Sequence, residues 1–230
     1  MRLRCGLPAL GVLLCTAGCQ TVVDGTAQPA DRLGPLPSVV VTTTTPSSSL
    51  QDKLLGQPEI AGIVGEAAMT QSMAITEPVN DTSTVDPSEC APLALPAQDT
   101  VYSSWMQITG NLSKGDGKHN VAQVVSLYKN DSKWSVSYAL HVWKDCAQPF
   151  TVKQDDGASQ VVPDPVTGDE TNATRISASM HSQANPNRVC QHVMAGKGNY
   201  MVETEVCGND GQTARQTDEI TDRILAKIPD

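Results

Sequence analysis

Residues 188–207 read RVCQHVMAGKGNYMVETEVC. Apolar and β-branched residues flank the small, polar segment 196–199, which predicts two β-strands, near 188–195 and 200–207, joined by a tight turn. Cys190 and Cys207 lie equally far from the centre of that turn. Residues that oppose each other in an antiparallel hairpin share this relation, so we expect the two cysteines to face each other at a distance that a disulfide can span.

Residues 1–18 have the pattern of a secretory signal peptide. Arg2 and Arg4 precede an apolar run, residues 7–14, which is too short to span a bilayer. Small residues then precede Cys19, an arrangement that resembles the bacterial lipobox and predicts removal of the leader and acylation of Cys19. The alternative is an ordinary secreted protein in which Cys19 has no such role. Both interpretations place the mature chain outside the cytoplasm, and the first anchors it by lipid to the extracytoplasmic face of the cell membrane.

Residues 19–49 are expected to form the lipidated N-terminus and a tether. They are rich in Thr, Ser and Pro and show no sustained helical or strand period. The same composition fits an O-glycosylated segment and an unmodified flexible linker. The folded domain is therefore expected to occupy residues 50–230.

The charge of the chain restricts its partners. The formal net charge is −9 at pH 7, so the chain repels nucleic acid and anionic head groups. Attachment to the membrane is therefore expected through the acyl chains and not through a basic patch. Hydrophobic residues make up 39% of the sequence, enough for one modest core.

Four cysteines remain after the leader and Cys19 are set aside: Cys90, Cys146, Cys190 and Cys207. An even number in an extracytoplasmic domain predicts two disulfides, for which three pairings are possible. The hairpin geometry selects Cys190–Cys207 and leaves Cys90–Cys146. No CxxC pair is present, which disfavours zinc and a thioredoxin-like redox motif, so we expect neither a metal nor a cofactor.

The other hydrophobic patterns predict an α+β domain. Local hairpins favour an antiparallel sheet of about five or six strands with two or three helices packed on one face, stapled by the two disulfides. Strands are expected near 69–76, 101–108, 121–128, 150–153 and 175–182 besides the hairpin, helices near 54–64, 132–146 and 213–228, and loops over 77–100 and 154–172.

The domain resembles the extracellular sensor domain of mycobacterial PknH-type serine/threonine kinases, which stand-alone mycobacterial lipoproteins share. The resemblance covers about residues 50–229 and rests on Cys90, the Trp143–Cys146 motif, Cys190-Gln191, Cys207-Gly208 and the closing amphipathic helix. It implies an antiparallel sheet with helices, disulfides that pair the first cysteine with the second and the third with the fourth, and a cleft for a small ligand. His192 stands where an arginine is expected in many relatives, which counts against an anion-binding role at that position.

Scarce aromatic residues supply the candidate binding site. We expect some of these residues to line an apolar cleft, with packing in the core as the alternative for each: Tyr102, Trp105, Tyr128, Trp134 and Tyr138. No Gly-x-Ser-x-Gly elbow, P-loop or dinucleotide fingerprint is present, so we expect no catalytic residues and no enzymatic activity.

Two functions are compatible with these patterns. The first is a non-catalytic, lipid-anchored sensor-like domain that binds a small cell-envelope ligand in a cleft. The second is an interaction module that docks another cell-envelope protein, for which an exposed apolar patch would be diagnostic.

Overall fold

The computed structural model describes residues 49–117, 119–154 and 157–230, all of which belong to one folded unit. Cys19 and the expected signal peptide and tether, apart from Ser49, lie outside the described residues. None of the helices in the described part has the length and apolar character needed to cross a membrane.

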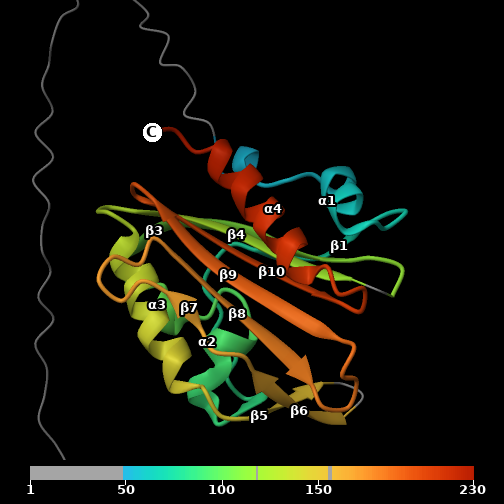
Figure 1. The fold of residues 1–230 in the computed structure, drawn as a ribbon. Coiled ribbons are helices and arrows are strands. Elements are labelled where there is room, and N and C mark those ends of the chain that lie inside the picture. Colours follow the sequence, from blue (N-terminus) through green and yellow to red (C-terminus); the bar gives the residue numbers. More distant parts are fainter. Residues whose placement is uncertain (1–48, 118, 155–156) are drawn as a thin grey trace, which may run out of the picture. The chain divides into compact units, whose positions relative to one another are not determined.

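A single antiparallel sheet forms the centre of the domain (Figure 1). Within the described residues it has ten strands, nine of them in the order β1-β3-β4-β10-β9-β8-β6-β5-β2, with β7 paired to β8. The strands are β1 (Thr70–Ile75), β2 (Val85–Asp86), β3 (Trp105–Lys114), β4 (Asn120–Tyr128), β5 (Phe150–Gln154), β6 (Gly157–Pro163), β7 (Thr167–Gly168), β8 (Arg175–Ser182), β9 (Val189–Lys197) and β10 (Tyr200–Gly208).

The hairpin of β9 and β10 has the register expected from the sequence. Cys190 pairs with Cys207, and their sulfurs form a disulfide. The turn holds Gly198 at a φ of 57°, a left-handed conformation that glycine adopts without steric cost. The two strands lie at the middle of the sheet, so this hairpin sets the register for β4 on one side and β8 on the other.

The expected number of strands, about five or six, was too small. Most of the excess comes from residues 154–172, expected to be a loop, which contain β6 and β7. β6 pairs with β5 and β8, and β7 pairs with β8, so these strands are defined by hydrogen bonds to neighbouring strands that the residue pattern of 154–172 does not show. The strand expected over 101–108 also begins later, at Trp105, because Val101 lies in a short 3₁₀ turn.

Helices cover both faces of the sheet, not one face as expected (Figure 1). They are α1 (Gln57–Val64), α2 (Ala91–Ala94), α3 (Lys133–Asp145) and α4 (Thr213–Ala226), with 3₁₀ turns η1 (Leu50–Lys53), η2 (Ser88–Cys90) and η3 (Asp99–Val101). The reason is the alternation of the central strands, which are apolar on both sides: in β10, Met201 faces α3 while Val202 and Val206 face α4.

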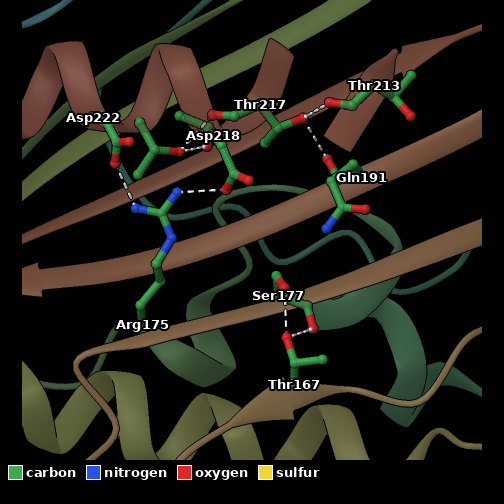
Figure 2. A network of polar contacts seen from close by, with 10 residues as sticks. Thr167, Arg175, Ser177, Gln191, Thr213, Thr217, Asp218 and Asp222 are labelled. Atoms are coloured by element: carbon green, nitrogen blue, oxygen red, sulfur yellow. Dashed lines mark hydrogen bonds and ion pairs between the residues drawn. The ribbon is translucent and has the colours of Figure 1, made fainter. Parts of the chain in front are cut away.

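On the α4 face, the helix contacts the sheet through an apolar stripe and through hydrogen bonds and ion pairs. Ile220 and Ile224 are fully buried against the sheet. The guanidinium of Arg175 on β8 donates to Asp218 at 2.6 Å and to Asp222 at 2.7 Å, one helical turn apart (Figure 2). The hydroxyl of Thr217 also donates to the backbone carbonyl of Gln191 at 3.4 Å. These contacts hold α4 across β8 and β9.

The α3 face carries the larger core. Val136, Leu140 and Trp143 of α3 are buried against the sheet. The second disulfide, Cys90–Cys146, links the end of α3 to η2 and α2. Both disulfides therefore have the pairing expected from the hairpin geometry, and the second one holds the segment around α2 onto this face.

Candidate functional site

The α3 face of the sheet is covered unevenly. At the end with the β9–β10 turn, α3 begins in close contact, since the hydroxyl of Ser132 donates to the carbonyl of Tyr200 at 2.6 Å. At the opposite end, beside the Cys190–Cys207 disulfide, the helices leave a cavity of about 270 Å³. The segment that follows α2 forms one of its walls.

Most of the cavity lining is apolar. The side chains come from β3, β4, β5, β6, β8 and the segment after α2, and they include Leu95, Leu112, Ala122, Val152, Val161 and Met180. These residues all lie on the α3 side of their strands, which explains why one face of a twisted sheet can line a continuous hollow. An apolar hollow with few polar groups is the usual form of a small-molecule site.

Three charged residues contribute to the lining: Lys114, Arg188 and Glu205. Glu205 is largely enclosed, with only 13% of its side chain exposed. Burial raises the pKa of its carboxyl to about 7, although the positive charges of His192 and Arg188 act in the opposite direction. The carboxyl of Glu205 is thus close to half ionised at neutral pH.

A buried polar network lies directly behind the cavity. The Nε2 of His192 lies 2.8 Å from Oε1 of Glu203, and the ring is fully buried. Oε2 of Glu203 accepts hydrogen bonds from the hydroxyl of Tyr102 and from the backbone N–H of Ala97, the latter at 2.9 Å. Burial raises the pKa of Tyr102 well above its ordinary value, helped by the charge of Glu203, so its hydroxyl stays a donor.

The network fixes the protonation of His192. Its Nδ1 lies 2.9 Å from the backbone carbonyl of Leu93, which can only accept, so Nδ1 carries a proton. Burial works to lower the pKa of His192, but the hydrogen bond and charge of Glu203 outweigh it and raise the pKa. One proton therefore lies between Nε2 of His192 and Oε1 of Glu203, and the raised pKa of His192 favours its position on the ring.

These side chains position the wall of the cavity. His192 holds the carbonyl of Leu93, Glu203 holds the N–H of Ala97, and Nε1 of Trp143 donates to the carbonyl of Pro92 at 2.9 Å. The rings of His192 and Trp143 also lie 4.5 Å apart. The wall residues after α2 are consequently held at both of their ends by buried groups of the sheet and α3.

The geometry does not support a metal at the disulfide. Cys190, Glu205 and Cys207 place their potential ligand atoms within 4.8 Å of one another. Both sulfurs are bonded to each other, so neither can act as a thiolate ligand. Among the described residues that line the cavity there is also no histidine to activate one of its serines.

The five aromatic residues predicted to bind ligand do not line this cavity. Tyr102 and Tyr128 are buried in the core on the α3 face, and Tyr102 belongs to the network behind the cavity. Trp105 and Tyr138 are partly exposed, and Trp134 is 75% exposed on α3. The structure therefore brings these residues to one side of the sheet without assembling them into one site.

Sequence reasoning missed the charged residues of the hairpin. Glu203 and Glu205 are acidic residues inside a strand at the centre of the sheet, and Glu205 lies opposite His192. The relation that placed Cys190 opposite Cys207, equal distance from the centre of the turn, also places His192 opposite Glu205. Charged side chains in a central strand are rare without a specific partner, and that was the available signal.

Comparison with known proteins supports the assignment of the fold. The family model of PknH-like extracellular domains matches residues 45–227. The chain belongs to this family. A comparison with curated protein sequences finds no match.

Two solved structures are similar to this member of the PknH-like family. The crystal structure of the extracellular domain of PknH from Mycobacterium tuberculosis aligns with a TM-score of 0.64 and 23% identity, over 77% of this chain and 93% of that one. An uncharacterised protein from Mycobacterium smegmatis aligns with a TM-score of 0.38 and 13% identity, over 73% of this chain and 95% of that one. The first shows that the fold is shared, and the second is too distant to support an argument.

Proposed function

We propose that this PknH-like domain is a non-catalytic, sensor-like module that binds a small cell-envelope ligand in the cavity beside the Cys190–Cys207 disulfide. The observation that carries the proposal is the apolar cavity of about 270 Å³, whose wall is held in place by the buried network of His192 and Glu203. A preformed wall reduces the ordering cost of binding. The mature protein is proposed to lie at the extracytoplasmic face of the membrane, anchored through Cys19.

Native mass spectrometry tests ligand binding. The full chain is produced in a mycobacterial host with its disulfides intact, and the wild type is expected to carry an extra mass that leaves on denaturation. Ala122→Leu, which fills the cavity from β4, should remove that mass. Ala74→Leu, at an exposed position of β1, is the matched control and should keep it.

Two results would contradict ligand binding in the cavity. One is an extra mass that persists undiminished in Ala122→Leu. The other is a bare wild-type mass together with no rise in Tm during a screen of envelope lipids and glycans. Ligand that binds only the folded state must raise Tm, so the second measurement covers a ligand lost during purification.

The anchor requires a separate experiment. Mass spectrometry of the N-terminal peptide is expected to find acyl chains on Cys19, and Cys19→Ala should release the protein from the membrane fraction. If the N-terminal peptide of the wild type is unmodified and the protein is free in the medium, the chain is an ordinary secreted protein and the anchor is rejected.

A second candidate function is docking to another envelope protein. It is favoured by Trp134 and Tyr138, which lie one turn apart on α3 and are 75% and 49% exposed. A photo-crosslinking residue at Trp134 should then capture one defined partner in cells, whereas the same residue at Glu219 on α4 should not. Equal labelling at both positions would reject docking through α3.

A further inference from the structure

In the part of the chain that the structure describes, the Glu205 carboxyl has no N–H or O–H donor. Among the described residues, no donor lies within hydrogen-bond distance of its Oε2, which is fully covered. Its Oε1 lies 3.5 Å from Sγ of Cys207, and a disulfide sulfur carries no hydrogen to donate. A buried carboxyl group without donors is costly for a fold, so its presence calls for an explanation.

The neighbouring charged groups do not supply the missing donor. Nδ1 of His192 lies 4.0 Å from Oε2, but its proton is directed to the carbonyl of Leu93 at 2.9 Å. Glu203 on the same strand repels the Glu205 carboxylate, and Arg188 attracts it from outside hydrogen-bond distance. Because Oε2 is covered while the side chain lines the cavity, Oε1 is the oxygen that a ligand can reach.

The charges around the cavity restrict the ligand group that could donate to Oε1. A cationic ligand would meet Lys114 and Arg188, which also line the cavity. An anionic ligand would meet the Glu205 carboxylate. A neutral donor avoids both repulsions and still forms a hydrogen bond assisted by the charge of the acceptor.

The rest of the lining sets the size and polarity of the ligand. Leu112, Val161 and Met180 offer an apolar surface beside Glu205. An apolar cavity of about 150 Å³ accommodates benzene, so a cavity of about 270 Å³ has room for roughly ten non-hydrogen atoms.

We propose that the cavity binds a neutral, largely apolar alcohol whose hydroxyl group donates a hydrogen bond to Oε1 of Glu205. This inference rests on the proposed function, because it names the chemistry of the ligand that the same cavity would take. The hydroxyl group of a lipid or of a glycoside with an apolar substituent would satisfy it equally.

Two isomeric probes test the proposal on the full chain. 1-Octanol and heptyl methyl ether have the same atoms and nearly the same apolar surface, but only the alcohol can donate. Dissociation constants are measured at about pH 8.5, where the Glu205 carboxyl is ionised, from the amide signals of cavity residues in ¹H–¹⁵N correlation spectra. The alcohol should bind at least about tenfold more tightly than the ether, since a hydrogen bond to a charged group typically contributes that much binding free energy.

Variants connect the preference to Glu205. In Glu205→Leu the alcohol and the ether should bind with equal affinity, because the acceptor is gone. Glu77→Leu removes an exposed carboxylate outside the cavity and should keep the preference of the wild type. The comparison of the two probes in the wild type tests the proposal even if Glu205→Leu does not fold.

The outcomes separate this inference from the function on which it rests. If neither probe shifts the cavity signals of the wild type, the cavity does not take small apolar ligands and both proposals fail. If both probes bind with equal affinity, ligand binding stands and the role of Glu205 is overturned. Tighter binding of n-octylamine or octanoate than of 1-octanol would also overturn it, since the ligand would then not be neutral. Sources are distinguished by repeating the titration with methyl glucoside, whose hydroxyl groups belong to a sugar of nearly the size that the cavity admits. Tighter binding than that of 1-octanol indicates a glycoside, and weaker binding indicates a lipid alcohol.

Discussion

The hairpin of β9 and β10 carries three titratable residues that are fully or largely enclosed: His192, Glu203 and Glu205. His192 and Glu203 form a hydrogen-bonded pair that holds neighbouring backbone groups, whereas Glu205 has no donor. The first two residues therefore have a structural reason to be buried. For Glu205 the described residues supply no such donor, and its side chain lines the cavity instead.

Stability should report this difference through its pH dependence. The carboxyl of Glu205 has a pKa of about 7 in the folded protein and an ordinary value of 4.5, because burial disfavours the charged form. The folded state thus holds the proton more tightly than the unfolded chain. The protonated Glu205 carboxyl therefore contributes its full stabilisation of the folded state below pH 4.5, and this contribution is lost as the pH rises through about 7.

Glu205→Gln should therefore gain stability relative to the wild type as the pH rises. The advantage at about pH 8.5 should exceed that at about pH 5.5 by about 2 kcal/mol, measured as free energies of unfolding in urea. His192, Glu203 and Arg188 face the carboxyl and are the same in both proteins. Glu77→Gln, at an exposed position, should show no such change, and a pH-independent difference for Glu205→Gln would contradict the raised pKa.

At the scale of elements, the start of α3 and the β9–β10 hairpin approach each other closely. Ser132 donates to backbone carbonyls of Gly198 and Tyr200, and a Cβ added at Gly196 would lie 2.7 Å from Oγ of Ser132. Glycine at position 196 is thus required by the contact between two elements and not by the conformation of its own backbone.

Gly196→Ala should destabilise the domain by about 1–3 kcal/mol, the usual cost of an overpacked contact. Gly62→Ala is the matched control, because Gly62 is exposed in the middle of α1 and no atom lies within 4 Å of its added Cβ. Alanine there should stabilise the domain by about 0.5–1 kcal/mol. Thermal or urea unfolding of both variants checks the prediction, and equal effects of the two substitutions would contradict it.

At the scale of the whole molecule, one sheet is shared by two apolar clusters. Leu140 and Trp143 belong to the cluster on the α3 face, and Ile220 and Ile224 to the cluster on the α4 face. Each cluster is completed by side chains of the same central strands. Loss of either cluster removes the burial on one side of β4 and β10.

Unfolding of the two faces should therefore be cooperative. Ile224→Ala should cost about 2–5 kcal/mol, and its urea transition monitored by tryptophan fluorescence should coincide with that monitored by far-UV circular dichroism. The fluorescence of buried Trp143 reports on the face opposite to the substitution. Leu140→Ala provides the reciprocal variant, and separated transitions in either variant would show two independent folding units.

Sequence alone was sufficient for features that depend on neighbours near in the chain. The register of the hairpin, the Cys190–Cys207 disulfide and the helices near α3 and α4 follow from turn geometry and from the 3.6-residue period. The Cys90–Cys146 disulfide then follows by elimination. The amphipathic stripe around Ile220 and Ile224 is a local signal of this kind.

Tertiary structure alone decided the number of strands, the faces that the helices cover and the place of the cavity. β6 has no pattern that distinguishes it from a loop until β5 and β8 supply its hydrogen bonds. Glu205 becomes a candidate ligand-binding residue only because the segment after α2, held by His192 and Glu203, closes a wall around it. The wall of the cavity depends on residues about a hundred positions apart in the chain, and no local period encodes which of them will meet.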